Sequence, residues 1–97
     1  MFDQENVLNW VYSACDAVNR DLPAEEKIEK SRDTVLHGDE SSVDSLSLIN
    51  LMMEVESVVE KESRKRLSLM NADAFNSGRF ATIETFSNYV CEQVNKP

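Results

Sequence analysis

The sequence predicts a small all-α domain, a four-helix bundle with three main helices, one short helix and a long loop between the first two. In three separate stretches, apolar residues recur at spacings of three and four, which is typical of one face of a helix. Only two glycines and two prolines are present, too few for a turn-rich β fold. The 97 residues suffice for one domain, residues 1–97, with a modest core.

The first helix is predicted over residues 6–18. Asp3 is a suitable N-cap, because its carboxylate can accept a backbone N–H of the first turn. Pro23 disfavours helix in the residue before it, so the helix should end near residues 20–22. The residues expected on its buried face are Val7, Trp10, Val11, Ala14 and Val18.

Residues 22–43 form the expected long loop. Residues 24–31 have room for a helical turn or two, and the large apolar residues before Val43 are Ile28, Val35 and Leu36. Residues 38–42 combine glycine, acids and serines, which favour turns. Long loops in small domains are typically functional or mobile, and this one leads directly to Ser45.

A second helix is predicted from about residue 45 to residue 59 or slightly beyond, with Asp44 as its cap. Its buried face is expected to carry Leu46, Ile49, Met52, Met53, Val55 and Val59. An exposed polar stripe is expected on Ser47, Asn50, Glu54 and Ser57. A basic cluster follows, Lys61, Arg64, Lys65 and Arg66, which suits the C-terminal end of a helix.

The last part of the chain should hold one short and one longer helix. Residues 67–70 are an apolar connector, and residues 71–75 are expected to form one helical turn that places Phe75 on the core. Thr82 is expected to cap the last helix. The apolar face of that helix would carry Ile83, Phe86, Tyr89, Val90 and Val94.

The charge of the chain excludes several classes of partner. The net charge is −8, and residues 1–60 hold fourteen acids and four bases. This acidic part repels nucleic acid and anionic lipid and favours basic protein partners. No apolar stretch reaches membrane-spanning length, and residues 1–5 lack the basic start of a secretion signal, so a cytoplasmic location is expected.

Cysteine and histidine do not indicate a metal site. Cys15 and Cys91 stand far apart in the sequence, and His37 is the one histidine, so the close spacing that metal ligands show is missing. We expect both cysteines to be buried and reduced, and His37 to be a solvated loop residue.

The most informative motif is Asp44-Ser45-Leu46, which opens the second predicted helix. A serine there would lie beside free backbone N–H groups, a suitable place for a covalently attached phosphodiester. Serine is also common at helix starts simply as a cap. Together with Asp33-Thr34-Val35-Leu36 upstream and the segment Val43 to Glu56, this motif resembles the acyl carrier protein family.

The resemblance implies a function for the chain. In that family the serine of Asp-Ser-Leu receives a 4′-phosphopantetheine arm from coenzyme A, so the attachment site here would be Ser45, with Asp44 recognised by the phosphopantetheinyl transferase and Leu46 completing the motif. Acyl groups would be held on the arm as thioesters and passed between loading and transferring enzymes of fatty acid, polyketide or specialised lipid synthesis. The cofactor carries the chemistry, so a monomeric carrier without catalytic activity is expected.

The chain departs from the family pattern at several positions. Ser42 and Val43 stand where members usually have glycine, and Ser47 and Asn50 stand where acids commonly follow the motif. Losing those charges weakens docking to basic enzymes and indicates a specialised pathway. Two alternatives remain, an aminoacyl or peptidyl carrier of nonribosomal peptide type and an unmodified helical adaptor protein.

Overall fold

The computed structural model describes residues 2–37, 43–69, 78 and 80–96, and only the backbone of Ser45. Within these residues the chain forms three α-helices, α1 (Gln4–Asn19), α2 (Ser45–Ser63) and α4 (Ile83–Val94), and one 3-10 turn, η1 (Ala24–Glu26). No strand occurs in this described part, so the all-α expectation is confirmed. The short helix expected over residues 71–75, with Phe75, lies outside it.

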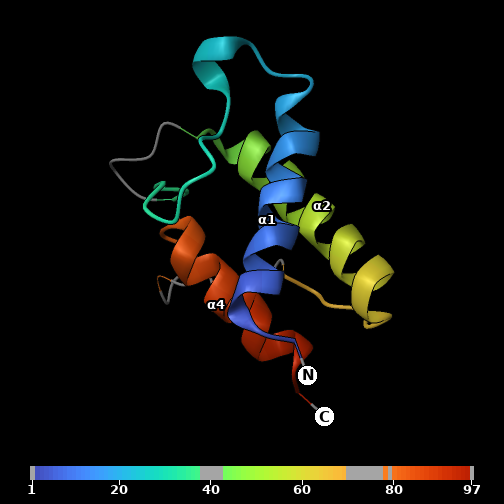
Figure 1. Ribbon diagram of the computed structural model, residues 1–97. Coiled ribbons are helices and arrows are strands. Elements are labelled where there is room, and N and C mark those ends of the chain that lie inside the picture. The colour runs from blue at the N-terminus through green and yellow to red at the C-terminus, as the bar shows by residue number, and fades with distance from the viewer. Residues whose placement is uncertain (1, 38–42, 70–77, 79, 97) are drawn as a thin grey trace.

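The helix α1 lies at the centre of the arrangement, because it packs against both α2 and α4 (Figure 1). Its start is as predicted, with the Asp3 carboxylate accepting the Asn6 N–H at 2.8 Å. Trp10 is only half-buried and packs edge-on against Phe2. The other four residues predicted for the buried face, Val7, Val11, Ala14 and Val18, are buried.

The buried face of α2 differs from the predicted one. Leu46 and Met53 were expected in the core, yet their exposed fractions are 68% and 58%. Met52, Val55 and Val59 are buried as predicted, and Ile49 is half-buried. Ser47, Leu48 and Leu51, which were not predicted for this face, are also buried. The physical reason is that α2 is apolar on most of its circumference, so its neighbours rather than its own pattern decide which side is buried.

The long loop between α1 and α2 is anchored at several points. After η1, the side-chain amide of Asn19 forms two hydrogen bonds with the backbone of Ile28. It accepts the Ile28 N–H at 2.7 Å and donates to the Ile28 carbonyl at 2.9 Å. Both Ile28 and Leu36 are buried in the core. Val35 and Thr82 then form an isolated antiparallel bridge, which brings the loop to the start of α4.

The helix α4 follows the prediction closely. Thr82 is its N-cap, and with Thr85 it forms a capping box. All five predicted face residues are buried, namely Ile83, Phe86, Tyr89, Val90 and Val94. At its far end, Asn95 exchanges two hydrogen bonds with the backbone of Phe2, at 2.9 and 2.8 Å, so the two chain ends lie side by side (Figure 1).

Candidate functional site

The motif Asp44-Ser45-Leu46 lies where the sequence predicted it, at the N-terminus of α2. Asp44 has extended backbone angles and its carboxylate accepts the Ser47 N–H at 2.7 Å. Its carbonyl accepts the Leu48 N–H at 3.0 Å. Ser45 is therefore the first helical residue, directly after a well-formed cap.

The first turn of α2 retains capacity to bind a negative charge. The Leu46 N–H has no hydrogen-bond partner among the described residues, and the Leu46 side chain is exposed. Unpaired N–H groups and the helix dipole favour an anion at such a position. The Asp44 carboxylate opposes a nearby phosphate, although its hydrogen bond to Ser47 offsets part of that charge.

The polar stripe predicted along α2 needs one correction. Ser47 was expected to face solvent, but it is buried, because it falls on the side of α2 that packs into the domain. Asn50 and Ser57 are exposed and Glu54 is half-buried. A carboxylate at position 47 would be costly to bury, so a serine suits this buried position better than an acid.

The basic cluster at the end of α2 is partly engaged within the chain. The Lys65 ammonium donates to the Lys96 carbonyl at 2.7 Å, and Arg66 lies 3.4 Å from Glu60. Arg64 caps the helix in the left-handed region with φ of 62°, a conformation that glycine adopts at lower cost. This end of α2 lies roughly 28 Å from Ser45 at 1.5 Å per residue, so the two are separate surfaces.

Sequence reasoning missed the contact of Glu56. Its carboxylate accepts the Leu69 N–H at 2.9 Å and so ties the segment after α2 back to the middle of the helix. Leu69 itself is fully buried. The spacing of thirteen residues matches no local hydrogen-bonding pattern, so the sequence carries no signal for this contact.

The two cysteines are buried and unpaired with each other, as predicted. Burial, reinforced by the Asp16 carboxylate, raises the pKa of the Cys15 thiol to about 12. Burial also raises the pKa of the Cys91 thiol, whose sulfur lies 3.4 Å from the Asn95 amide nitrogen. Both thiols are therefore poor nucleophiles near neutral pH.

His37 is an exposed loop residue, as expected. In the described part of the chain no three His, Cys, Asp or Glu side chains come together as metal ligands would. None of the helices there is both long and apolar enough to span a membrane.

Comparison of the chain with known protein families, with curated proteins and with solved structures finds no match.

Proposed function

We propose that this protein is a carrier that holds acyl groups as thioesters on a 4′-phosphopantetheine arm attached to Ser45. The arm would come from coenzyme A through a phosphopantetheinyl transferase. In this proposal the short helix expected over residues 71–75 completes a four-helix bundle of the acyl carrier type. The carrier would act in the cytoplasm, between enzymes that load and remove the acyl group.

The observation that carries the proposal is the position of Asp44-Ser45-Leu46 at the capped first turn of α2. A carrier needs an accessible attachment point on a rigid element, and it needs no catalytic pocket, because the cofactor supplies the reactive thiol. The Leu46 side chain is exposed, and the Leu46 N–H has no hydrogen-bond partner among the described residues. These two features support an accessible side of this turn.

The proposal also assigns a partner surface. Asn50, Glu54 and Ser57 lie beyond Ser45 on α2 and remain candidates for contacts with partner enzymes. Ser47 is buried, so it is not part of that surface. One acid and two neutral residues make this a weakly charged face, which favours partners that dock with little electrostatic steering.

The test is the mass of the intact protein before and after incubation with coenzyme A and a broad-specificity phosphopantetheinyl transferase. We expect the mass to rise by one phosphopantetheine group, and the Ser45→Ala variant to gain nothing. Ser13→Ala, an exposed serine on α1 outside the partner surface, is the control and should be modified like the wild type. A folded wild-type protein that gains no mass would contradict the proposal and favour an unmodified adaptor.

A further inference from the structure

A group of basic side chains at the C-terminal end of α2 has no role in the proposed attachment of the arm. Four of them lie in the last turn of α2 or just after it, and the fifth follows α4. The Lys65 ammonium donates to the Lys96 carbonyl at 2.7 Å, so the two segments lie side by side at one end of the domain (Figure 1). We call these residues the basic end: Lys61, Arg64, Lys65, Arg66 and Lys96.

Most of the positive charge of the basic end is not neutralised by the described part of the chain. The side chains of Lys61 and Arg64 are exposed and form no ion pair or hydrogen bond there. Lys65 donates to a carbonyl, which carries no formal charge. Arg66 lies 3.4 Å from Glu60, but the Arg66 side chain is 87% exposed. Solvent, or a partner, therefore has access to these cations.

The basic end is an exception in an acidic protein. Three carboxylates lie within one helical turn of its members along the chain, namely Glu60, Glu62 and Glu92. Five cations thus stand against three nearby carboxylates, whereas the whole chain carries a net charge of −8. Cations stabilise the last turn of a helix, which accounts for Lys61 but not for Arg66, three residues beyond that turn.

Arg64 ends α2 in a conformation that is costly for its side chain. Its φ is 62°, and it is the one non-glycine residue with positive φ among those described. Glycine adopts this left-handed conformation at lower cost and is the usual residue after a helix. No ion pair or hydrogen bond of the Arg64 side chain offsets that cost within the described residues. A strained residue without such a compensating contact is a reason to look for a ligand or a partner.

The distribution of charge selects among the possible anions. Nucleic acid and an anionic lipid surface are extended, so they would also meet the acidic remainder of the chain, which repels them. A second copy of the chain carries the same net charge of −8 and is repelled as well. An acidic patch on another protein can match the basic end alone, and its carboxylates form strong hydrogen bonds with arginine and lysine.

We propose that the basic end is a docking surface for an acidic patch of a partner protein. The inference goes beyond the carrier function, because it concerns the unmodified chain and a surface roughly 28 Å from Ser45 along α2. The partner's carboxylates pair with Lys61 and Arg64, and the Ser45 end stays accessible. Attraction between such patches speeds association and weakens as salt is added.

The first test titrates the unmodified full chain with a short synthetic peptide rich in glutamate, at low ionic strength, and follows backbone amide NMR signals. We expect the signals of residues 61–66 and of Lys96 to shift, those of residues 45–57 to stay, and added salt to reverse the shifts. The absence of shifts at the basic end would overturn the inference. So would equal shifts with inorganic phosphate at the same concentration, since the basic end would then bind any small anion.

Charge reversal separates the basic end from the net charge of the chain. Lys61→Glu combined with Arg64→Glu should weaken peptide binding about tenfold or more, because two ion pairs are replaced by repulsion. The matched control is Arg20→Glu combined with Lys27→Glu. These two cations are also exposed and without ion pairs among the described residues, and the net charge changes equally. Equal losses in the two double variants would overturn the inference.

Sedimentation of the chain alone at rising concentration tests the second copy as occupant. We expect a monomer throughout. Self-association that Lys61→Glu with Arg64→Glu abolishes would overturn the inference, because a second copy would then occupy the basic end. Neither experiment involves Ser45, so failure of this inference and failure of the carrier function are distinguishable.

Arg64→Gly distinguishes docking from a role in folding. Glycine relieves the left-handed backbone, so the variant should unfold at a higher urea concentration than the wild type. It should also bind the acidic peptide about threefold more weakly, because one exposed ion pair is lost. A variant that is less stable than the wild type, or that binds the peptide equally well, would overturn the role given to Arg64 and with it the inference.

Discussion

The N-termini of α2 and α4 are capped in the same way, but they differ in the pairing of their other backbone N–H groups. Each helix has a cap side chain that accepts the N–H three residues later, Asp44 in α2 and Thr82 in α4. In α4 the next two N–H groups, of Ile83 and Glu84, donate to loop carbonyls at 3.0 Å each. In α2 the N–H of Leu46 has no such partner in the described residues.

Within the described residues, this difference separates a helix start whose backbone donors are paired from one that keeps an unpaired donor. The loop carbonyls of Arg32 and Thr34 occupy the donors of α4, so an anion has no N–H groups to bind there. The start of α2 keeps a donor and an exposed leucine. Within the described residues, the loop thus pairs the donors at the start of α4 and leaves the Leu46 N–H at the start of α2 unpaired.

The largest expected effect comes from loosening the loop at its core anchor. Leu36 is fully buried and its N–H donates to the Ala81 carbonyl at 2.7 Å. Leu36→Ala should lower the free energy of unfolding by about 3 kcal/mol, because it leaves a cavity. The matched truncation Leu46→Ala should change it by less than about 0.5 kcal/mol. Urea unfolding followed by helical circular dichroism measures both, and equal losses would contradict the comparison.

A second prediction concerns the buried cysteines, Cys15 in α1 and Cys91 in α4, and the effect of Cys15 on stability at high pH. An exposed thiol in the unfolded chain has a pKa of 9.0, and burial in the folded chain raises the pKa of Cys15 to about 12. Between these values the unfolded chain loses the proton and the folded chain keeps it, so stability falls as pH rises. At pH 10.5 the loss should be about 2 kcal/mol relative to pH 8.

Urea unfolding at pH 8 and pH 10.5 tests this prediction, with Cys15→Ala as the control. The variant starts less stable because a buried side chain is shortened, but it should lose less stability on going to high pH. Parallel losses in the two proteins would mean that Cys15 does not cause the pH dependence.

A third prediction removes the same backbone donor from each helix. Glu84 and Leu46 both occupy the second helical position, where proline is tolerated because it lies in the first turn. Glu84→Pro abolishes the hydrogen bond to the Arg32 carbonyl, and Leu46→Pro abolishes none in the described residues. Glu84→Pro should therefore cost about 1–2 kcal/mol more than Leu46→Pro.

The same urea unfolding assay measures this difference, and Glu84→Ala controls for the loss of the glutamate side chain. If Leu46→Pro proves as costly as Glu84→Pro, the start of α2 is closed by contacts as strong as those of α4. The proposed open state of the Ser45 turn would then be wrong.

Both helix starts were predictable from the sequence because capping is local. Asp44 and Thr82 each precede an apolar periodic run, and the structure confirms both as caps. The exposure of Leu46 and Met53 was not predictable, because α2 has apolar residues on most sides and the position of α1 selects the buried one. Ser47 was missed for the same reason, since a small polar residue gives no sign of burial.

No sequence pattern indicated the hydrogen bonds between the loop and the first turn of α4. Its acceptors are the backbone carbonyls of Arg32 and Thr34, a group that every residue carries. The hydrogen bonds between the Asn19 side chain and the Ile28 backbone were equally unpredictable, because a single asparagine does not specify a partner nine residues away. Leu36 and Ile28 both lie in the hydrophobic core, so long-range packing, which the sequence does not display, helps bring these segments together.

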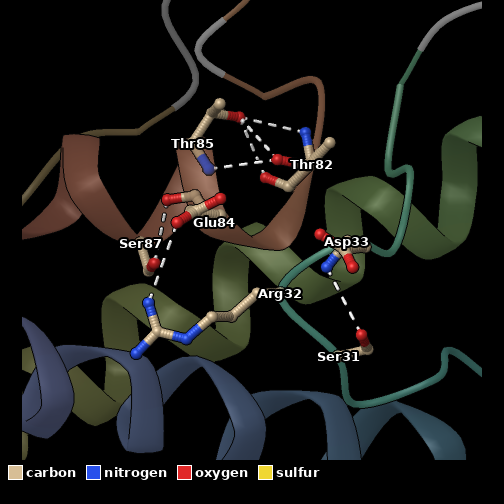
Figure 2. A network of polar contacts seen from close by, with 7 residues as sticks. All are labelled: Ser31, Arg32, Asp33, Thr82, Glu84, Thr85 and Ser87. Carbon is tan, nitrogen blue, oxygen red and sulfur yellow. Dashed lines mark hydrogen bonds and ion pairs between the residues drawn. The ribbon is translucent and has the colours of Figure 1, made fainter.

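The smallest expected effect distinguishes the backbone of Arg32 from its side chain. The guanidinium lies 3.8 Å from the Glu84 carboxylate, and both side chains are about half exposed (Figure 2). Exposed pairs of this kind are screened by water and salt, so Arg32→Gln should lower stability by less than about 0.5 kcal/mol. The variant keeps the carbonyl that accepts the Glu84 N–H. The contrary result would be a loss of stability as large as that of Glu84→Pro that disappears in high salt. It would show that the ion pair, rather than the backbone hydrogen bond, holds the loop to α4. The difference between the starts of α4 and α2 would then be electrostatic.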